Sequence, residues 1–288
     1  METKCKSKKT PPVVEYENEQ QEFSGIERPP YSVDAGYPYF KRPLLWKIAS
    51  FFAYRAIMTP FAFLYAKIKF RLTVVNKQAF KSLSKQGYFV YGNHTLMAGD
   101  AFFPSLVAFP RKTVVIVNAD NLAVPATRWW IELCGALPLP TKISGTRSFL
   151  EAVEYAAKKG YGIQIYPEAH IWPYYTGIRR FGSDAFFYPA RLLSPVFCTT
   201  VTYQQKKHGK TPRVTLFVDG PFYPDPSLSV RERADALQKT VFETMCERAK
   251  NSTYQAIHYK KKDTPSVSSA SEQTNQSSRK ETYLHEQK

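Results

Sequence analysis

The chain has 288 residues, of which 43% are hydrophobic and 15% aromatic, and its formal net charge at pH 7 is +16. This length and composition allow a substantial buried core and exclude global disorder. The positive charge lies in residues 31–259, which carry 29 basic and 14 acidic side chains. We therefore expect a folded region with anionic partners, such as lipid headgroups, phosphorylated substrates or nucleic acid.

The cysteines are spread along the chain without paired spacing, at Cys5, Cys134, Cys198 and Cys246. This spacing predicts neither a zinc site nor a disulfide framework, and it favours a reducing compartment. The first thirty residues are charged and lack an apolar core segment, so no secretory signal is predicted there.

Composition divides the chain into four parts. Residues 1–40 are predicted to be disordered or extended, and residues 258–288, rich in Ser, Gln, Thr and Lys, to be a disordered tail. Between them we expect membrane-associated helices over residues 41–70 and an α/β domain over residues 71–257.

The segment Leu44–Ala66 is apolar and long enough to cross a bilayer, but it contains Lys47, Arg55 and Pro60. Each basic side chain near mid-bilayer would cost roughly 2.5–3.5 kcal/mol. A broken pair of helices lying in the membrane interface, with basic side chains reaching the headgroups, is the favoured prediction. The alternative is a buried helix pair of a soluble domain.

From residue 71 onward, strand and helix patterns alternate. Residues 145–159 place apolar side chains on one helical face, with Ser144 or Thr146 as the cap and Gly160 as the stop, and residues 229–250 form a final amphipathic helix. The predicted strands are RLTVV, GYFVYGN, KTVVIVN, YGIQIYP and SPVFCTTVTY. This order predicts an α/β fold with a mainly parallel sheet flanked by helices, preceded by the interfacial helix pair.

A first polar motif follows the strand GYFVYGN, where His94 stands six residues before Asp100 at the start of a predicted helix. An imidazole can accept a proton from an attacking hydroxyl when a carboxylate holds its other nitrogen in the right tautomer. His94 could thus be a general base oriented by Asp100. The alternative is a local hydrogen bond of His94 and a helix N-terminal carboxylate.

A second motif, IQIYPEAHIWPYYTGIRRF, leaves another apolar strand at residues 163–181. The loop is too long and too rich in polar and aromatic groups for a plain connection. Taken singly, Glu168 could be a helix cap, His170 a loop histidine and the arginines a solvated surface. Together, Arg179 and Arg180 suit a phosphate and Glu168 a glycerol hydroxyl.

GNHTLMAGDAFFP, YPEAHIWPYYTGIRRF and SPVFCTTVTY together resemble the glycerophospholipid acyltransferase family, which includes lysophosphatidic acid acyltransferases, and in particular a bacterial subgroup. The resemblance covers roughly residues 46–249. It implies a membrane-bound α/β enzyme in which His94, oriented by Asp100, activates an acceptor hydroxyl to attack an acyl thioester. The expected substrate-binding residues are Asn93, Glu168, Arg179 and Arg180.

The chain departs from the family pattern at two places. Five residues instead of the usual four separate His94 from Asp100, and Gly99 is expected to absorb the extra one through its backbone freedom. The usual glycine, threonine and arginine after the motif glutamate are replaced by residues 169–171, Ala-His-Ile. If the acceptor carries a phosphate, Arg179 or Arg180 must then bind it, and other possible sources of the lost charge are Lys142 and Arg147.

The resemblance implies an O-acyltransferase that converts lysophosphatidic acid to phosphatidic acid in phospholipid biosynthesis, with an acyl-carrier protein or coenzyme A thioester as co-substrate and no cofactor or metal. Membrane phospholipids are expected partners at the cytoplasmic face. One alternative is a catalytically silent lipid-binding membrane protein with the same fold, and another is an acyltransferase for a different lyso-lipid. Nucleic-acid binding is not expected, because no recognised binding motif is present.

Overall fold

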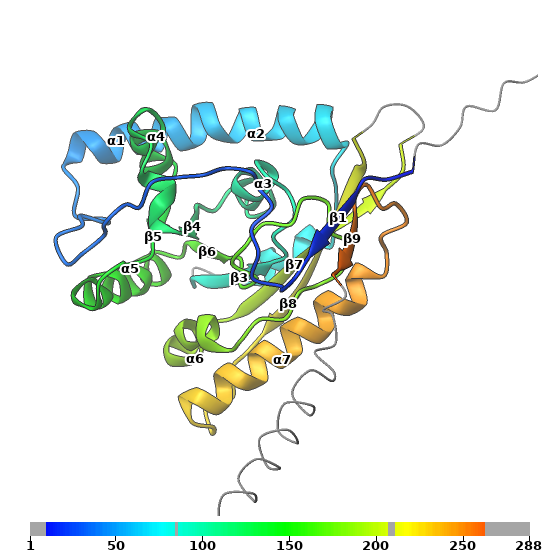
Figure 1. Cartoon of the computed structure of the whole chain (residues 1–288). Helices are drawn as coiled ribbons and strands as arrows, with labels where there is room; N and C mark the ends of the chain where they lie inside the picture. Colours follow the sequence, from blue (N-terminus) through cyan, green and yellow to red (C-terminus); the bar gives the residue numbers. More distant parts are fainter. Residues whose placement is uncertain (1–9, 84–85, 207–210, 263–288) are drawn as a thin grey trace, which may run out of the picture.

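The computed structural model describes residues 10–83, 86–206 and 211–262, in which a seven-stranded sheet lies between two layers of helices (Figure 1). Across the sheet the strand order is β2-β8-β7-β3-β6-β4-β5. These strands are β2 (Thr73–Val75), β3 (Tyr88–Gly92), β4 (Thr113–Val117), β5 (Ala136–Pro138), β6 (Gly162–Ile165), β7 (Val196–Gln204) and β8 (Arg213–Phe222).

The sheet is mainly parallel, as predicted. Neighbouring strands run parallel everywhere except between β7 and β8. All five predicted strands are confirmed, whereas β5 and β8 were not predicted. The three central strands, β7, β3 and β6, are almost entirely buried, as expected when helices cover both faces of a sheet.

Two groups of helices cover the two faces of the sheet (Figure 1). One layer holds α1 (Leu44–Phe52), α2 (Thr59–Tyr65), α3 (Gly99–Val107) and α4 (Pro125–Leu133). The other holds α5 (Thr146–Lys158), α6 (Phe187–Leu192) and α7 (Val230–Ala249). The predicted final helix is therefore confirmed, and it begins with a capping box in which Ser229 and Glu232 bond each other's backbone N–H groups.

The predicted cap of α5 is wrong. Its N-cap residue is Gly145, which has helical backbone angles and no side-chain bond, because a 3₁₀ turn over Ile143–Gly145 leads directly into the helix. A side-chain cap needs an extended backbone at that point. The predicted stop at Gly160 is confirmed by its positive φ of 73°.

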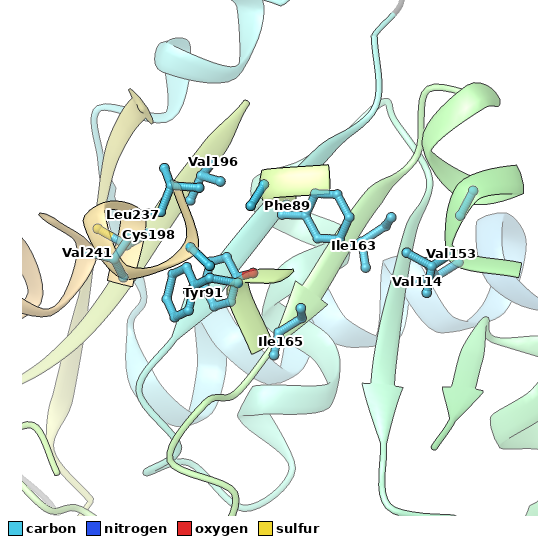
Figure 2. Close-up of a cluster of buried hydrophobic side chains, with 14 of the residues drawn as sticks. Phe89, Tyr91, Val114, Val153, Ile163, Ile165, Val196, Cys198, Leu237 and Val241 are labelled. Atoms are coloured by element: carbon cyan, nitrogen blue, oxygen red, sulfur yellow. The ribbon is translucent and has the colours of Figure 1, made fainter. Parts of the chain in front are cut away.

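Each face of the sheet has its own hydrophobic core. Figure 2 shows the core on the side of α5 and α7, where Val153 lies beside Val114 of β4 and Val241 beside Cys198 of β7. On the opposite face, Phe103 of α3 and Phe70 pack over Val90 and Phe197. The two cores fix α3 and the ends of β3 and β6, which carry both polar motifs.

The segment predicted as a broken helix pair is one helical run over Leu44–Phe70. α1 and α2 are joined by a π-helical turn at Ala53–Met58, and a second such turn, Ala66–Phe70, ends the run. Pro60 does not break the helix, because it lies in the first turn of α2 after the wider π turn. The hydroxyl of Thr59 donates to the Tyr54 carbonyl at 2.7 Å, which helps to satisfy the backbone at this point.

Residues 10–40 and 258–262, which composition predicts to be disordered or extended, contain extended segments that pack on the domain. β1 (Val13–Tyr16) and β9 (His258–Lys261) pair in parallel as a separate two-stranded sheet beside the main one (Figure 1). The composition of these segments is polar, but Tyr16, Phe23 and Tyr259 are partly buried and pack against the ring of Trp172, which lies in a loop of the main domain. Residues 1–9 and 263–288, the rest of the predicted flanks, lie outside the described residues.

Candidate active site

The sheet brings the two sequence motifs together. β3 and β6 are parallel neighbours with Tyr91 opposite Ile165, so the segments that leave their carboxyl ends meet at one edge of the sheet. The backbone N–H of His94, two residues after β3, donates to Oε2 of Glu168 at 3.2 Å. Two motifs more than seventy residues apart thus share one site.

His94 and Asp100 form the predicted pair. His94 Nδ1 lies 2.7 Å from Asp100 Oδ2, and the imidazole side chain is 23% exposed while the carboxylate side chain is only 4% exposed. The same carboxylate oxygen accepts the N–H of Leu96 at 3.0 Å. Because Nδ1 faces a buried carboxylate, Nε2 is the nitrogen left to exchange a proton with a ligand.

Tyr166 holds the pair from one side. Its ring stacks on the imidazole of His94 with centroids 4.7 Å apart, and its hydroxyl donates to the Asp100 carbonyl at 2.6 Å. We did not predict a role for Tyr166, although its place at the end of a strand, directly before the Pro-Glu pair, is a signal that could have suggested one.

Burial raises the pKa of the Asp100 carboxyl, while hydrogen bonds from His94 and from the backbone of Leu96 and Thr95 oppose that rise. The carboxylate is thus desolvated but faces three donors. This environment suits a group that stabilises a neighbouring imidazolium without leaving the protein interior.

The extra residue between His94 and Asp100 is accommodated by a turn. The N–H of Asp100 donates to the Leu96 carbonyl at 2.9 Å, so the chain already turns before α3 begins. The expectation that Gly99 absorbs the insertion through unusual backbone angles is wrong, because Gly99 lies within α3 and has no positive φ. Glycine is instead required at position 99 for packing, because a Cβ there would lie 2.9 Å from Leu96 Cβ.

Asn93 is not placed to contact a substrate. Its side chain is buried and bonds both backbone groups of Val201, accepting from the N–H at 2.8 Å and donating to the carbonyl at 3.1 Å. Asn93 therefore continues the pairing of β3 with β7 beyond the last strand residue and fixes the backbone where His94 follows.

Glu168 and Arg179 also lie together, but in the interior. Arg179 is 2% exposed and Glu168 3% exposed, and Nη2 of the guanidinium is 2.9 Å from Oε2 of the carboxylate. The same Nη2 donates to the His170 carbonyl, and Arg179 N–H donates to Glu168 Oε1 at 3.1 Å. Burial raises the pKa of the Glu168 carboxyl against the lowering effect of Arg179. Both side chains are bonded to protein, so the structure gives neither an open face for a substrate.

The remaining predicted cations lie at the surface. Arg180 is exposed, and its backbone N–H donates to Glu19 Oε2 at 3.2 Å. Lys142 is exposed, and the guanidinium of Arg147 is paired with Glu151 at 3.1 Å. Their contact with a phosphate stays a prediction.

A cavity of about 20 Å³ lies behind the pair, lined in part by Asn93, Asp100 and Tyr166. That volume has room for one water molecule and not for a lipid or a thioester. Substrates must therefore approach His94 from its exposed side. No cluster of three or more metal-ligating side chains occurs in residues 10–83, 86–206 and 211–262.

The fold and site define an α/β protein with a half-buried His-Asp pair at the carboxyl edge of its sheet. No protein-family model and no curated protein matches the chain. Among solved structures, the chain is similar to the 1-acyl-sn-glycerophosphate (LPA) acyltransferase PlsC from Thermotoga maritima, with 16% sequence identity and a TM-score of 0.47, over 74% of this chain and 98% of that chain. A similarity of this degree carries no argument about activity, so the function has to be argued from the residues.

Proposed function

We propose that the protein is a membrane-associated O-acyltransferase, which moves a fatty acyl group from a thioester to the hydroxyl of a glycerol lyso-lipid. The observation that carries this proposal is the 2.7 Å contact between His94 Nδ1 and Asp100 Oδ2, with the imidazole partly exposed and the carboxylate buried. It is the arrangement that a general base acting on a hydroxyl requires.

The chemistry follows from that contact. Asp100 holds the proton on Nδ1, and Nε2 of His94 takes the proton of the acceptor hydroxyl as its oxygen attacks the thioester carbonyl. When the tetrahedral intermediate collapses, the carbon–sulfur bond breaks and the thiolate leaves with the proton held by His94. Because a thioester is already activated, no covalent acyl-protein intermediate is needed.

The proposed acceptor is lysophosphatidic acid and the product phosphatidic acid, with an acyl-carrier protein or coenzyme A thioester as donor. Support for this choice comes from the sequence resemblance and from the positive charge of residues 31–259. Against it stands the burial of Arg179, the arginine expected to bind the phosphate. That observation favours a second candidate, an acyltransferase for a lyso-lipid with another headgroup.

Membrane association is supported by the run Leu44–Phe70, which is long and apolar enough to cross a membrane, while only 33% of its most apolar stretch is buried. Its outward side chains are mostly large and apolar, including Leu45, Phe51, Phe52, Phe61, Phe63 and Ile68. Exposed lysines at both ends, Lys47 and Lys67, suit an orientation in the plane of an anionic interface at the cytoplasmic face. Arg42, just before the run, is instead paired with Glu132 at 3.1 Å.

The test incubates purified protein with an acyl thioester and vesicles containing one lyso-lipid at a time, and follows both acylated product and released thiol. His94→Ala is measured beside the wild type, with thermal unfolding to show that it stays folded. Loss of turnover by two orders of magnitude or more in a folded variant supports the proposal. Product only from phosphate-free lyso-lipids would favour the second candidate. Vesicle binding without any turnover would instead favour a catalytically silent lipid-binding protein.

A further inference from the structure

The N-terminal segment crosses the loop that follows β6. Trp172 Nε1 donates to the Gln21 carbonyl at 2.8 Å, and Ile171 N–H donates to Glu22 Oε2 at 3.1 Å. In return, Phe23 N–H donates to the Ile171 carbonyl at 3.1 Å. The loop and the N-terminal segment are therefore joined over several consecutive residues.

The same segment completes the surroundings of the buried arginine. Nη1 of Arg179 donates to the Glu19 carbonyl at 3.1 Å, and the guanidinium lies over the Trp172 ring with 5.0 Å to its centroid. Because an unpaired buried guanidinium group is costly, removing Glu19 from this place would weaken the burial of Arg179.

The C-terminal segment packs on the other side of Trp172. Tyr259 of β9 stacks on the indole with centroids 4.9 Å apart, and its hydroxyl donates to the Pro173 carbonyl at 3.0 Å. Tyr16 of β1 meets the same indole edge-on at 4.6 Å. We call residues 13–23 together with residues 258–262 the clasp. Among the described residues its two strands pair only with each other, and a lone two-stranded sheet is marginal in water. The Trp172 cluster and the hydrogen bonds to Ile171 and Arg179 therefore hold the clasp to the domain.

The loop held by the clasp also holds the backbone of the proposed base. Trp172 N–H donates to the His94 carbonyl at 3.1 Å, and Tyr174 N–H donates to the Thr95 carbonyl at 2.9 Å. Glu168, bonded to Arg179, accepts the N–H of His94. Both backbone polar groups of His94 are thus fixed by residues of this loop: Trp172 contacts the clasp directly, and Glu168 is connected to it through Arg179.

From this continuity we infer that the clasp is a functional part of the active site, because residues 13–23 and 258–262 position His94 through Trp172 and Arg179. The inference rests on the proposed function. Glu22 and Tyr259 are positioning residues, because neither touches the imidazole, and they act through the loop. A base displaced by a fraction of an ångström still binds substrates but transfers protons slowly, so the defect should fall on kcat and leave KM unchanged.

The test changes one side chain at each end of the chain in the full-length protein. Glu22→Ala removes the acceptor of Ile171 N–H, whereas Glu22→Gln keeps an oxygen there. Tyr259→Ala removes the ring stacked on Trp172, whereas Tyr259→Phe keeps it. Glu27→Ala, at an exposed glutamate nearby, is the charge-matched control. For each variant, kcat, KM and the rate of carbethoxylation of His94 by diethyl pyrocarbonate are measured, the last by mass spectrometry.

We expect kcat to fall by about tenfold in each alanine variant with KM within about twofold of wild type, and the modification rate of His94 to rise. The Gln and Phe variants should recover most of kcat. Values of kcat and modification rate equal to those of Glu27→Ala would overturn the inference. If the wild type turns over no substrate, the proposed function fails, and the modification rates alone then decide whether the clasp positions His94.

Discussion

Replacing Asp100 by asparagine tests the proposed chemistry most directly, because the change keeps size and removes charge. The carboxylate faces three donors, namely His94 Nδ1, Leu96 N–H and Thr95 N–H. His94 Nδ1 and Leu96 N–H both meet Oδ2, so an asparagine that places its NH₂ group there sets it against the Leu96 N–H donor. An unsatisfied buried donor costs about 1–3 kcal/mol.

The loss of activity has a separate cause. Without the carboxylate, the imidazolium that forms as His94 takes the hydroxyl proton loses its buried counter-charge at 2.7 Å. General-base catalysis of this kind is worth about 10²–10⁴-fold, or about 2.7–5.4 kcal/mol of transition-state stabilisation. We expect Asp100→Asn to lose that much kcat with little change in KM.

Steady-state turnover of the thioester, with lyso-lipid vesicles as acceptor, measures this loss. Asp235→Asn, the same substitution on the exposed face of α7, is the control and should behave as wild type. An Asp100→Asn variant that keeps more than a tenth of wild-type kcat would refute the assignment of His94 as a base oriented by Asp100.

Three further predictions follow from single features. Ala169 has a φ of 62°, so Ala169→Gly should raise the free energy of unfolding by about 1 kcal/mol in chemical denaturation, and no gain would mean that the loop is unstrained. The hydrogen bond from the Lys262 ammonium lowers the pKa of the Glu17 carboxyl. Burial acts to raise the pKa of the Glu22 carboxyl, but hydrogen bonds from the backbone N–H groups of Ser24 and Ile171 lower it below its ordinary value. The stability that the two carboxylates add is therefore present above their ordinary pKa and is lost as the pH falls through the lowered values. Hydrogen exchange at Phe23 N–H should therefore accelerate in acid more than exchange in the central strands, and equal acceleration would contradict this. Phe63→Asp, at an outward phenyl ring of α2, should weaken vesicle binding about tenfold or more, unlike an aspartate at exposed Phe187 on the opposite layer; equal effects would argue against the helix as the membrane surface.

Much of the site could be predicted because its geometry is local. His94 and Asp100 lie within seven residues of each other, and a strand-to-helix turn brings such residues together without help from the rest of the chain. To predict the contact between His94 and Glu168, one must also assume that the strands before them, β3 and β6, are parallel neighbours. β8 was also within reach, since its buried residues Val214, Leu216 and Val218 alternate as a half-buried strand requires.

The missed features depend on contacts that are distant in sequence. The hydrogen bond from Arg179 to the Glu19 carbonyl joins residues 160 positions apart, and no local sequence pattern predicts it. The polar composition of residues 10–23 indicates disorder, but a few aromatic side chains are enough to order them once Trp172 offers a buried surface. Composition averages over such residues, and so it did not predict the strands at residues 13–16 and 258–261.

The sequence and the structure indicate different roles for Arg179, and one substitution distinguishes a phosphate ligand from a buried structural residue. The sequence motif and the family resemblance predict Arg179 or Arg180 as a phosphate ligand, whereas the structure places the Arg179 guanidinium between Glu168, the Glu19 carbonyl and the Trp172 ring. Lysine keeps the positive charge but cannot bond two acceptors through a planar fork. If Arg179 acts through its buried contacts with the protein, Arg179→Lys should lower the free energy of unfolding by about 1–3 kcal/mol. It should also lower kcat equally for phosphate-bearing and phosphate-free acceptors. A stable variant whose KM rises only for phosphate-bearing acceptors would restore the phosphate role. Arg180→Ala, at the exposed neighbour, shows the size of the KM effect that a surface cation can exert.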